Sequence, residues 1–239
     1  MSAHDLSART VLVAGGTGNV GEGIVRALLT SGARVVVPSA RPGRLAELRE
    51  LLGAERAARL ELVDHPYESF DDAAALADRL ADHGLTDAVA AIGGWHQGEH
   101  VWELTEETWR RDFLSTVTTH VALARAFVRA LPADGSYTFI TGTASVEAVA
   151  TAGPVSMAGA AQLMLRQVVS AEAAGSPRAV SLVLGPIVSR SRPQGKKEWL
   201  TADQAGEAVA HVVATPGLRD ETIAAPTVDA LEGLLGATA

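Results

Sequence analysis

Cysteine is absent from this 239-residue chain, and that absence removes several kinds of chemistry. Without a thiol, the chain forms no disulfide, has no thiolate nucleophile and offers no thiolate ligand to a metal ion. Aromatic residues are also scarce, at 4% of the chain. The rest of the composition, 47% hydrophobic and 20% charged, is ordinary for a globular protein.

The chain also lacks an excess of positive charge, because 20 Lys and Arg face 28 Asp and Glu, for a net charge of −8. A protein that binds the nucleic-acid backbone needs a basic face, so we expect no nucleic-acid partner. No uninterrupted apolar run reaches the roughly 18 residues that a membrane helix requires. Residues 1–9 are polar and lead directly into a strand, so we expect no signal peptide and a cytoplasmic location.

What the sequence does contain is a regular alternation of strand-like apolar runs with longer helical patterns. This alternation predicts an α/β fold: a single Rossmann-type, doubly wound domain over residues 1–239, with a mostly parallel seven-stranded sheet and helices on both faces. The expected strands are 10–14, 35–37, 60–63, 87–92, 136–141, 179–184 and 222–225. The expected helices are 19–31, 44–52, 71–83, 106–131, 154–173 and one that opens at a capping box of Thr201 and Gln204.

A glycine-rich turn joins the first expected strand to the first expected helix. Glycines at such a turn let an anionic pyrophosphate approach the backbone, and the helix start then offers it free N–H groups and a partial positive charge. The alternative is a tight turn with no ligand. The residues that we predict to bind the dinucleotide at this turn are Gly15, Thr17, Gly18, Asn19, Val20 and Gly21.

The end of the second expected strand favours NADP over NAD. A carboxylate there would bind the ribose 2′-hydroxyl of NAD, but the sequence has Ser39, Arg41 and Arg44 and no acid before Glu47. An arginine can form charge-assisted hydrogen bonds with a 2′-phosphate. The alternative is that both arginines belong to a solvated first helical turn.

Further polar residues follow the later strands, at the edge where an α/β active site lies. Thr143 and Ser145 follow the fifth strand, and His96 follows the fourth, so all three are candidate catalytic residues. No two histidines have the i, i+4 helical spacing of a metal site, so we expect no metal. Residues 186–200 form a polar loop that we interpret as a lid over the substrate.

These residues and their order resemble the short-chain dehydrogenase/reductase family over almost the whole chain. The glycines at 15, 18 and 21 are most similar to its atypical branch, because Asn19 stands where the common pattern has a glycine. The resemblance implies an adenine contact at Asp64. It also implies backbone contacts to the dinucleotide from the positions that match further family motifs, which are Gly93, Gly94, Pro186 and Val188.

The same resemblance shows that the family's proton-handling residues are missing. The tyrosine and lysine positions fall on Val155 and Gly159, the serine position on Gly142, and the helix asparagine position on Thr116. Valine has no transferable proton and glycine has no side chain. Loss of a positioned acid commonly lowers a rate by a factor of about 10²–10⁴.

The sequence therefore leaves three functional hypotheses. The first is an NADP-dependent oxidoreductase that acts on a small carbonyl or alcohol with a non-standard acid. The second is a dinucleotide-binding sensor or noncatalytic subunit, and the third is a non-redox enzyme on the same fold. The resemblance also implies a homodimer or homotetramer that associates through the helices 106–131 and 154–173.

Overall fold

A computed structural model describes residues 4–236, and its centre is one parallel sheet of seven strands in the order β3-β2-β1-β4-β5-β6-β9. Every neighbouring pair of strands in this sheet is parallel, so the expected fold class is confirmed. The strands are β1 Thr10–Ala14, β2 Arg34–Ser39, β3 Leu60–Asp64, β4 Asp87–Ala90, β5 Ser136–Gly142, β6 Arg178–Leu184 and β9 Thr222–Ala225. A separate small sheet pairs β7 Ile187–Val188 with β8 Leu200–Thr201.

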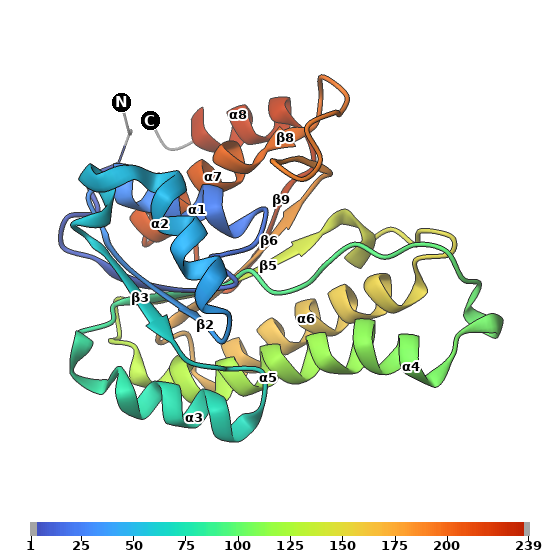
Figure 1. The fold of residues 1–239 in the computed structure, drawn as a ribbon, viewed down its shortest axis with the longest axis horizontal. Helices are drawn as coiled ribbons and strands as arrows, with labels where there is room; N and C mark the ends of the chain where they lie inside the picture. Colours follow the sequence, from blue (N-terminus) through green and yellow to red (C-terminus); the bar gives the residue numbers. More distant parts are fainter. Residues whose placement is uncertain (1–3, 237–239) are drawn as a thin grey trace.

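Helices cover the sheet on both faces (Figure 1). One layer consists of α1 Gly21–Thr30, α2 Pro42–Ala57, α7 Ala202–Ala214 and α8 Val228–Gly236. The other layer consists of α3 Phe70–Arg79, α5 Ser115–Phe127 and α6 Gly153–Glu172. The strands carry little polar alternation because both of their faces are buried under these helices.

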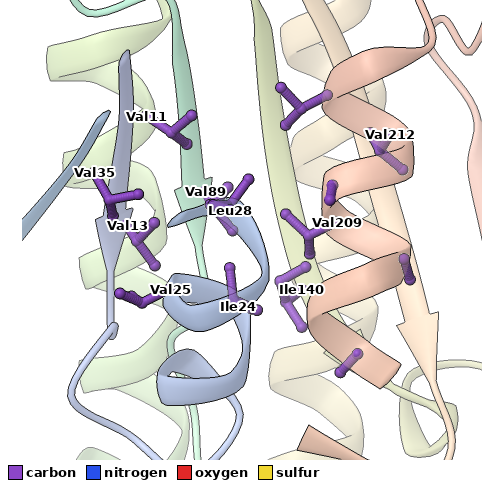
Figure 2. Packing of buried hydrophobic residues seen from close by; sticks show 14 of the residues in the cluster. Val11, Val13, Ile24, Val25, Leu28, Val35, Val89, Ile140, Val209 and Val212 are labelled. Carbon is purple, nitrogen blue, oxygen red and sulfur yellow. The ribbon is translucent and has the colours of Figure 1, made fainter. Parts of the chain in front are cut away.

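Two apolar cores form between the sheet and its two helical layers. Figure 2 shows the first, in which Ile24, Val25 and Leu28 of α1 and Val209 and Val212 of α7 point toward the strands. All five of these side chains are fully buried. The spacing of 24, 25 and 28 places the apolar residues of α1 on one face, as an amphipathic helix on a sheet requires.

Some helices differ from the sequence expectation in their ends and continuity. The expected helix 106–131 is interrupted after α4 Glu106–Trp109 by a π-helical turn, Arg110–Leu114, before α5 begins. The expected helix 19–31 begins at Gly21. The capping box of Thr201 and Gln204 is confirmed, since each residue's side chain accepts a hydrogen bond from the other's backbone N–H, at 3.1 and 2.8 Å.

The strand order places a crevice between the carboxyl ends of β1 and β4. The chain runs from β1 outward through β2 to β3 and then returns to β4 on the other side of β1. At such a switch point the connections leave in opposite directions, and ligands of open α/β sheets bind there. No helix within residues 4–236 is long and apolar enough to cross a membrane.

Candidate functional site

The turn from β1 to α1 is held tightly against β4 by two of its glycines. Gly15 has a φ of +82°, and a Cβ atom on it would overlap the carbonyl oxygen of Ala91. A Cβ atom on Gly21 would overlap the carbonyl oxygen of Gly15. Larger residues would push α1 away from the strands, so these glycines fix the start of α1 at the crevice.

The start of α1 leaves backbone donors free. Val20, the N-cap, provides no side-chain cap, and within residues 4–236 the N–H groups of Asn19 and Val20 have no acceptor. Free N–H groups at a helix start carry a partial positive charge and bind anions. The turn therefore has the geometry of a phosphate cradle.

Unpaired positive charge lies beyond the end of β2. Arg41 and Arg44 are exposed, and neither forms an ion pair with any residue that the structure describes. Ser39 is buried, and its hydroxyl accepts a hydrogen bond from the N–H of Arg41 at 3.2 Å. Asp64 lies beside Ser39 in the register of β2 and β3 and is exposed. Two guanidinium groups are thus free to bind an anionic ligand.

A cavity of about 340 Å³ opens at the switch point. Its walls come from the segments after β3 and β4, the π-helical turn with the start of α5, and the start of α6. Its lining residues are Tyr67, Glu68, Ile92, Gly93, Gly94, Trp95, His96, Arg111, Asp112, Ser115, Thr116, Thr119 and Val155. The cavity therefore brings together five residues that the sequence indicated: Gly93, Gly94, His96, Thr116 and Val155.

A carboxylate faces His96 across this cavity. The Nε2 atom of His96 lies 4.0 Å from the Oδ2 atom of Asp112, and no hydrogen bond to Nε2 is found in the described chain. The guanidinium of Arg111 holds both carboxylate oxygens of Asp112 at 2.8 Å. Hydrogen bonding by Arg111 lowers the pKa of Asp112, against a smaller effect of burial, so Asp112 is ionised near neutral pH. The imidazole of His96 thus lies beside a fixed negative charge.

Thr143 and Ser145 do not line the cavity. They form the 3₁₀ turn Thr143–Ser145, which follows β5. The hydroxyl of Ser145 donates a hydrogen bond to the carbonyl oxygen of Gly142 at 2.7 Å, so its proton is engaged in the turn. The backbone carbonyl of Thr143 accepts hydrogen bonds from Val146 and Glu147.

Helix α6 packs against that same turn at Gly159. A Cβ atom on Gly159 would lie 2.7 Å from the Cβ atom of Ser145 and 2.9 Å from the Oγ1 atom of Thr141. No side chain fits there unless the turn moves. One helical turn earlier, Val155 presents only hydrocarbon to the cavity.

The loop of residues 186–200 is tied to both helices beside the crevice. Arg190 contacts Glu22 of α1 at 3.3 Å and Glu47 of α2 at 2.6 Å. At the far end of the loop, the guanidinium of Arg192 lies 4.3 Å from the ring centre of Trp199. Val188 lies in β7 and Pro186 is exposed just before it. The loop therefore lies across the α1–α2 side of the crevice.

Several cavity residues were not among those expected from the sequence. The sequence spacing could have indicated Asp112, because this residue precedes Thr116 by four positions and so lies on the same helical face. Tyr67 follows β3 in an irregular segment with no periodicity, yet its hydroxyl accepts a hydrogen bond from the N–H of Gly15 at 3.2 Å. No group of three or more potential metal ligands occurs within residues 4–236.

Comparison with known proteins identifies the family. Residues 9–193 match the family model "short chain dehydrogenase", so the chain belongs to the short-chain dehydrogenase family. No curated protein sequence matches the chain.

Solved structures share the fold at low sequence identity. A short-chain dehydrogenase/reductase from Serratia marcescens has a TM-score of 0.82 at 15% identity, over 93% of this chain and 98% of its own. A short-chain oxidoreductase from Pseudomonas aeruginosa PAO1, which contains an atypical catalytic center, has a TM-score of 0.81 at 19% identity, over 92% and 97%. A short-chain dehydrogenase from Burkholderia cenocepacia, in complex with NADP, has a TM-score of 0.80 at 18% identity, over 92% and 97%.

Proposed function

We propose that this protein is an NADP-dependent oxidoreductase that reduces a small carbonyl compound or oxidises the matching alcohol. One observation carries the proposal: the free N–H groups at the start of α1 lie at the same crevice as a cavity with an imidazole–carboxylate pair. The glycine cradle fits a pyrophosphate, because a Cβ atom on Gly15 or Gly21 would overlap backbone atoms.

The preference for NADP rests on charge at the end of β2. Arg41 and Arg44 are free to bind a 2′-phosphate, and the end of β2 has Ser39 where an NAD-binding protein would need a carboxylate. The Burkholderia cenocepacia protein of the same fold is in complex with NADP, which supports the same preference. The remaining predicted contacts are Thr17, Gly18, Asn19 and Val20 at the turn, Asp64 at the adenine, and Gly93, Gly94, Pro186 and Val188 along the dinucleotide.

The bound dinucleotide would supply or accept the hydride, and the protein must handle the proton. His96 is the proposed acid: its protonated imidazole gives a proton to the carbonyl oxygen as the hydride reaches the carbonyl carbon. The carboxylate of Asp112 lies 4.0 Å from the Nε2 atom of this imidazole, and Arg111 holds Asp112 in place. The hydroxyl of Thr116 lines the same cavity and can orient the substrate oxygen. His96 is partly exposed, so solvent can restore its proton.

Replacing His96 tests this function. We expect His96→Asn to lower kcat for NADPH-dependent reduction of the best ketone or aldehyde in a panel by about 10²-fold, with NADPH affinity unchanged. His100→Asn is the matched control, because His100 is exposed in the same loop and does not line the cavity. Unchanged kcat in the His96 variant would exclude His96 as the acid.

A second candidate function is dinucleotide binding without turnover, as a sensor or noncatalytic subunit. The packing at Gly159 favours it, because the position of the family's lysine is filled by the turn Thr143–Ser145. Tight NADPH binding without reduction of any carbonyl in the panel would select this function.

We also propose that residues 1–239 form one domain and that residues 186–200 act as its substrate lid. Arg190 would then release Glu22 or Glu47 when the lid moves. Association through α5 and α6 into a homodimer or homotetramer is the proposed assembly.

A further inference from the structure

Tyr67 occupies an unusual place, between the apolar core and the glycine turn. Its ring packs in the core beneath the sheet with Leu12, Val36 and Leu123, and only 9% of the residue is exposed. Such packing leaves the phenol one orientation. Tyr67 also lines the cavity at the switch point.

Within residues 4–236, the hydroxyl of Tyr67 accepts a hydrogen bond but does not donate one. It accepts the N–H of Gly15 at 3.2 Å, and Gly15 cannot shift because its backbone is pressed against Ala91. The hydroxyl proton must therefore point elsewhere. No acceptor for this proton is found among residues 4–236. A donor that is held rigidly at a cavity wall and lacks an acceptor is available to a ligand.

The surroundings of Tyr67 keep this proton in place. Burial, and then the negative charge of Glu68, raise the pKa of Tyr67, while the hydrogen bond from Gly15 and the charge of Arg41 oppose the rise. The phenol is therefore protonated at neutral pH. Tyr67 follows the end of β3 by three residues, so it lies near the β2–β3 side of the crevice, where Ser39 and Asp64 end their strands.

We propose that Tyr67 is a ligand-binding residue whose hydroxyl donates a hydrogen bond to an oxygen on the adenosine half of the bound dinucleotide. This inference rests on the proposed function, because it assumes that a dinucleotide occupies the crevice. The acceptor is either a hydroxyl oxygen of the ribose or an oxygen of its phosphate. By accepting from Gly15 and donating to the ligand, Tyr67 links the glycine turn to the ligand through one fixed group.

Tyr67→Phe removes the hydroxyl and keeps the ring. We expect it to weaken ADP and NADPH binding roughly three- to tenfold, the effect of one hydrogen bond. Tyr137→Phe is the matched control, because Tyr137 is the other of the two tyrosines, is buried in the same core and does not line the cavity. It should leave both dissociation constants unchanged.

Calorimetry identifies the acceptor by comparing the affinity of Tyr67→Phe and of the parent protein for four ligands: adenosine, ADP, 2′-deoxy-ADP and 3′-deoxy-ADP. If Tyr67→Phe loses affinity for ADP but not for adenosine, the acceptor is a phosphate oxygen. A loss for ADP and adenosine that disappears with one deoxy analogue assigns that ribose hydroxyl. An equal loss for all four ligands would mean that the variant merely loosens the turn at Gly15, and no loss would mean that no contact exists; either result overturns the proposal.

A measurement on the unmutated sequence covers the case in which Tyr67→Phe fails to fold. Because the chain has only two tyrosines, fluorotyrosine labelling gives two fluorine resonances, which Tyr137→Phe assigns. ADP should shift the Tyr67 resonance and leave that of Tyr137 in place, and an unmoved Tyr67 resonance would overturn the proposal. If the protein binds neither NADPH nor ADP, the proposed function itself has failed, whereas binding without any effect at Tyr67 rejects only this inference.

Discussion

At the scale of single residues, Gly159 has the most direct structural consequence. Helix α6 approaches the turn after β5 so closely that a Cβ atom at this position would fall 2.7 Å from Ser145. A protein interior packed at this density accepts an added carbon only when its neighbours move. The packing of α6 therefore leaves no room for a side chain at this position.

Gly159→Ala should accordingly destabilise the protein. Overpacking typically costs about 1–3 kcal/mol, which outweighs the roughly 0.5–1 kcal/mol that alanine gains over glycine inside a helix. The free energy of unfolding, from urea titration followed by circular dichroism, measures this difference. Gly233→Ala is the control, because Gly233 lies in α8 with open space around its Cβ position and should gain stability. Equal stabilisation in both variants would contradict the packing described here.

Residue-level function was only partly predictable from the sequence. The glycine turn was predictable because close backbone approach demands glycine at fixed spacing in a strand–turn–helix context. His96 was indicated by its place after a strand, but its partner Asp112 depends on how the π-helical turn faces the β4 loop. The hydroxyls of Thr143 and Ser145 looked equally suitable, and only the three-dimensional structure shows the Ser145 hydroxyl bonded within its own turn.

At the scale of elements, a buried histidine joins α5 to the end of β4. The Nε2 atom of His120 lies 3.1 Å from the carbonyl oxygen of Ile92, and the side chain is fully buried beside Phe139. Burial lowers the pKa of His120 from 6.5 to about 4, against a smaller opposing effect of the hydrogen bond that His120 donates to the carbonyl oxygen of Ile92. His120 is therefore neutral in the folded protein at neutral pH.

This histidine should make the fold sensitive to acid. Because the folded pKa lies below the unfolded value, the unfolded chain binds the extra proton between pH 6.5 and about 4. The contribution of His120 to the free energy of unfolding is fully present above pH 6.5, and it falls by about 3 kcal/mol as the pH drops to 4.

His120→Gln, which keeps a donor for Ile92, should remove most of this pH dependence. Urea unfolding at pH 7 and pH 4.5 measures it, with His100→Gln as an exposed control. If the His120 variant loses as much stability on acidification as the parent protein, the buried histidine is not the cause.

Elements were more predictable than their boundaries. The strands were predictable because buried apolar runs on a doubly covered sheet contain few polar residues. The π-helical turn Arg110–Leu114 was not, because it widens a helix without changing the local residue preferences that indicate a helix. Gly53 has a φ of +76° inside α2, and this kink falls directly after the end of the expected helix 44–52.

At the scale of the whole molecule, α5 and α6 form one outer layer (Figure 1). Large apolar side chains remain exposed on α6, where Met164 and Val168 are 57% and 42% exposed and lie on the same helical face. Exposed apolar groups that cluster on one face are typical of an association surface.

Light scattering after size-exclusion chromatography tests this assembly. We expect a mass at least twice the chain mass of 24.7 kDa, and a shift toward monomer in the double variant Met164→Glu, Val168→Glu. Leu51→Glu is the control, because Leu51 is 41% exposed on α2, away from this layer. A monomeric parent protein, or an unchanged mass in the double variant, would contradict the proposed assembly.

Calorimetric titration of the purified protein with NADPH and NADH shows whether the crevice between β1 and β4 binds NADP. We expect one NADPH per chain, NADH bound roughly tenfold more weakly, and loss of this difference in Arg41→Ala because the free guanidinium holds the 2′-phosphate. Arg49→Ala, at an exposed arginine of α2, the helix that Arg41 precedes, should retain the difference. If neither dinucleotide binds, or if both bind with equal affinity, the crevice is not an NADP site.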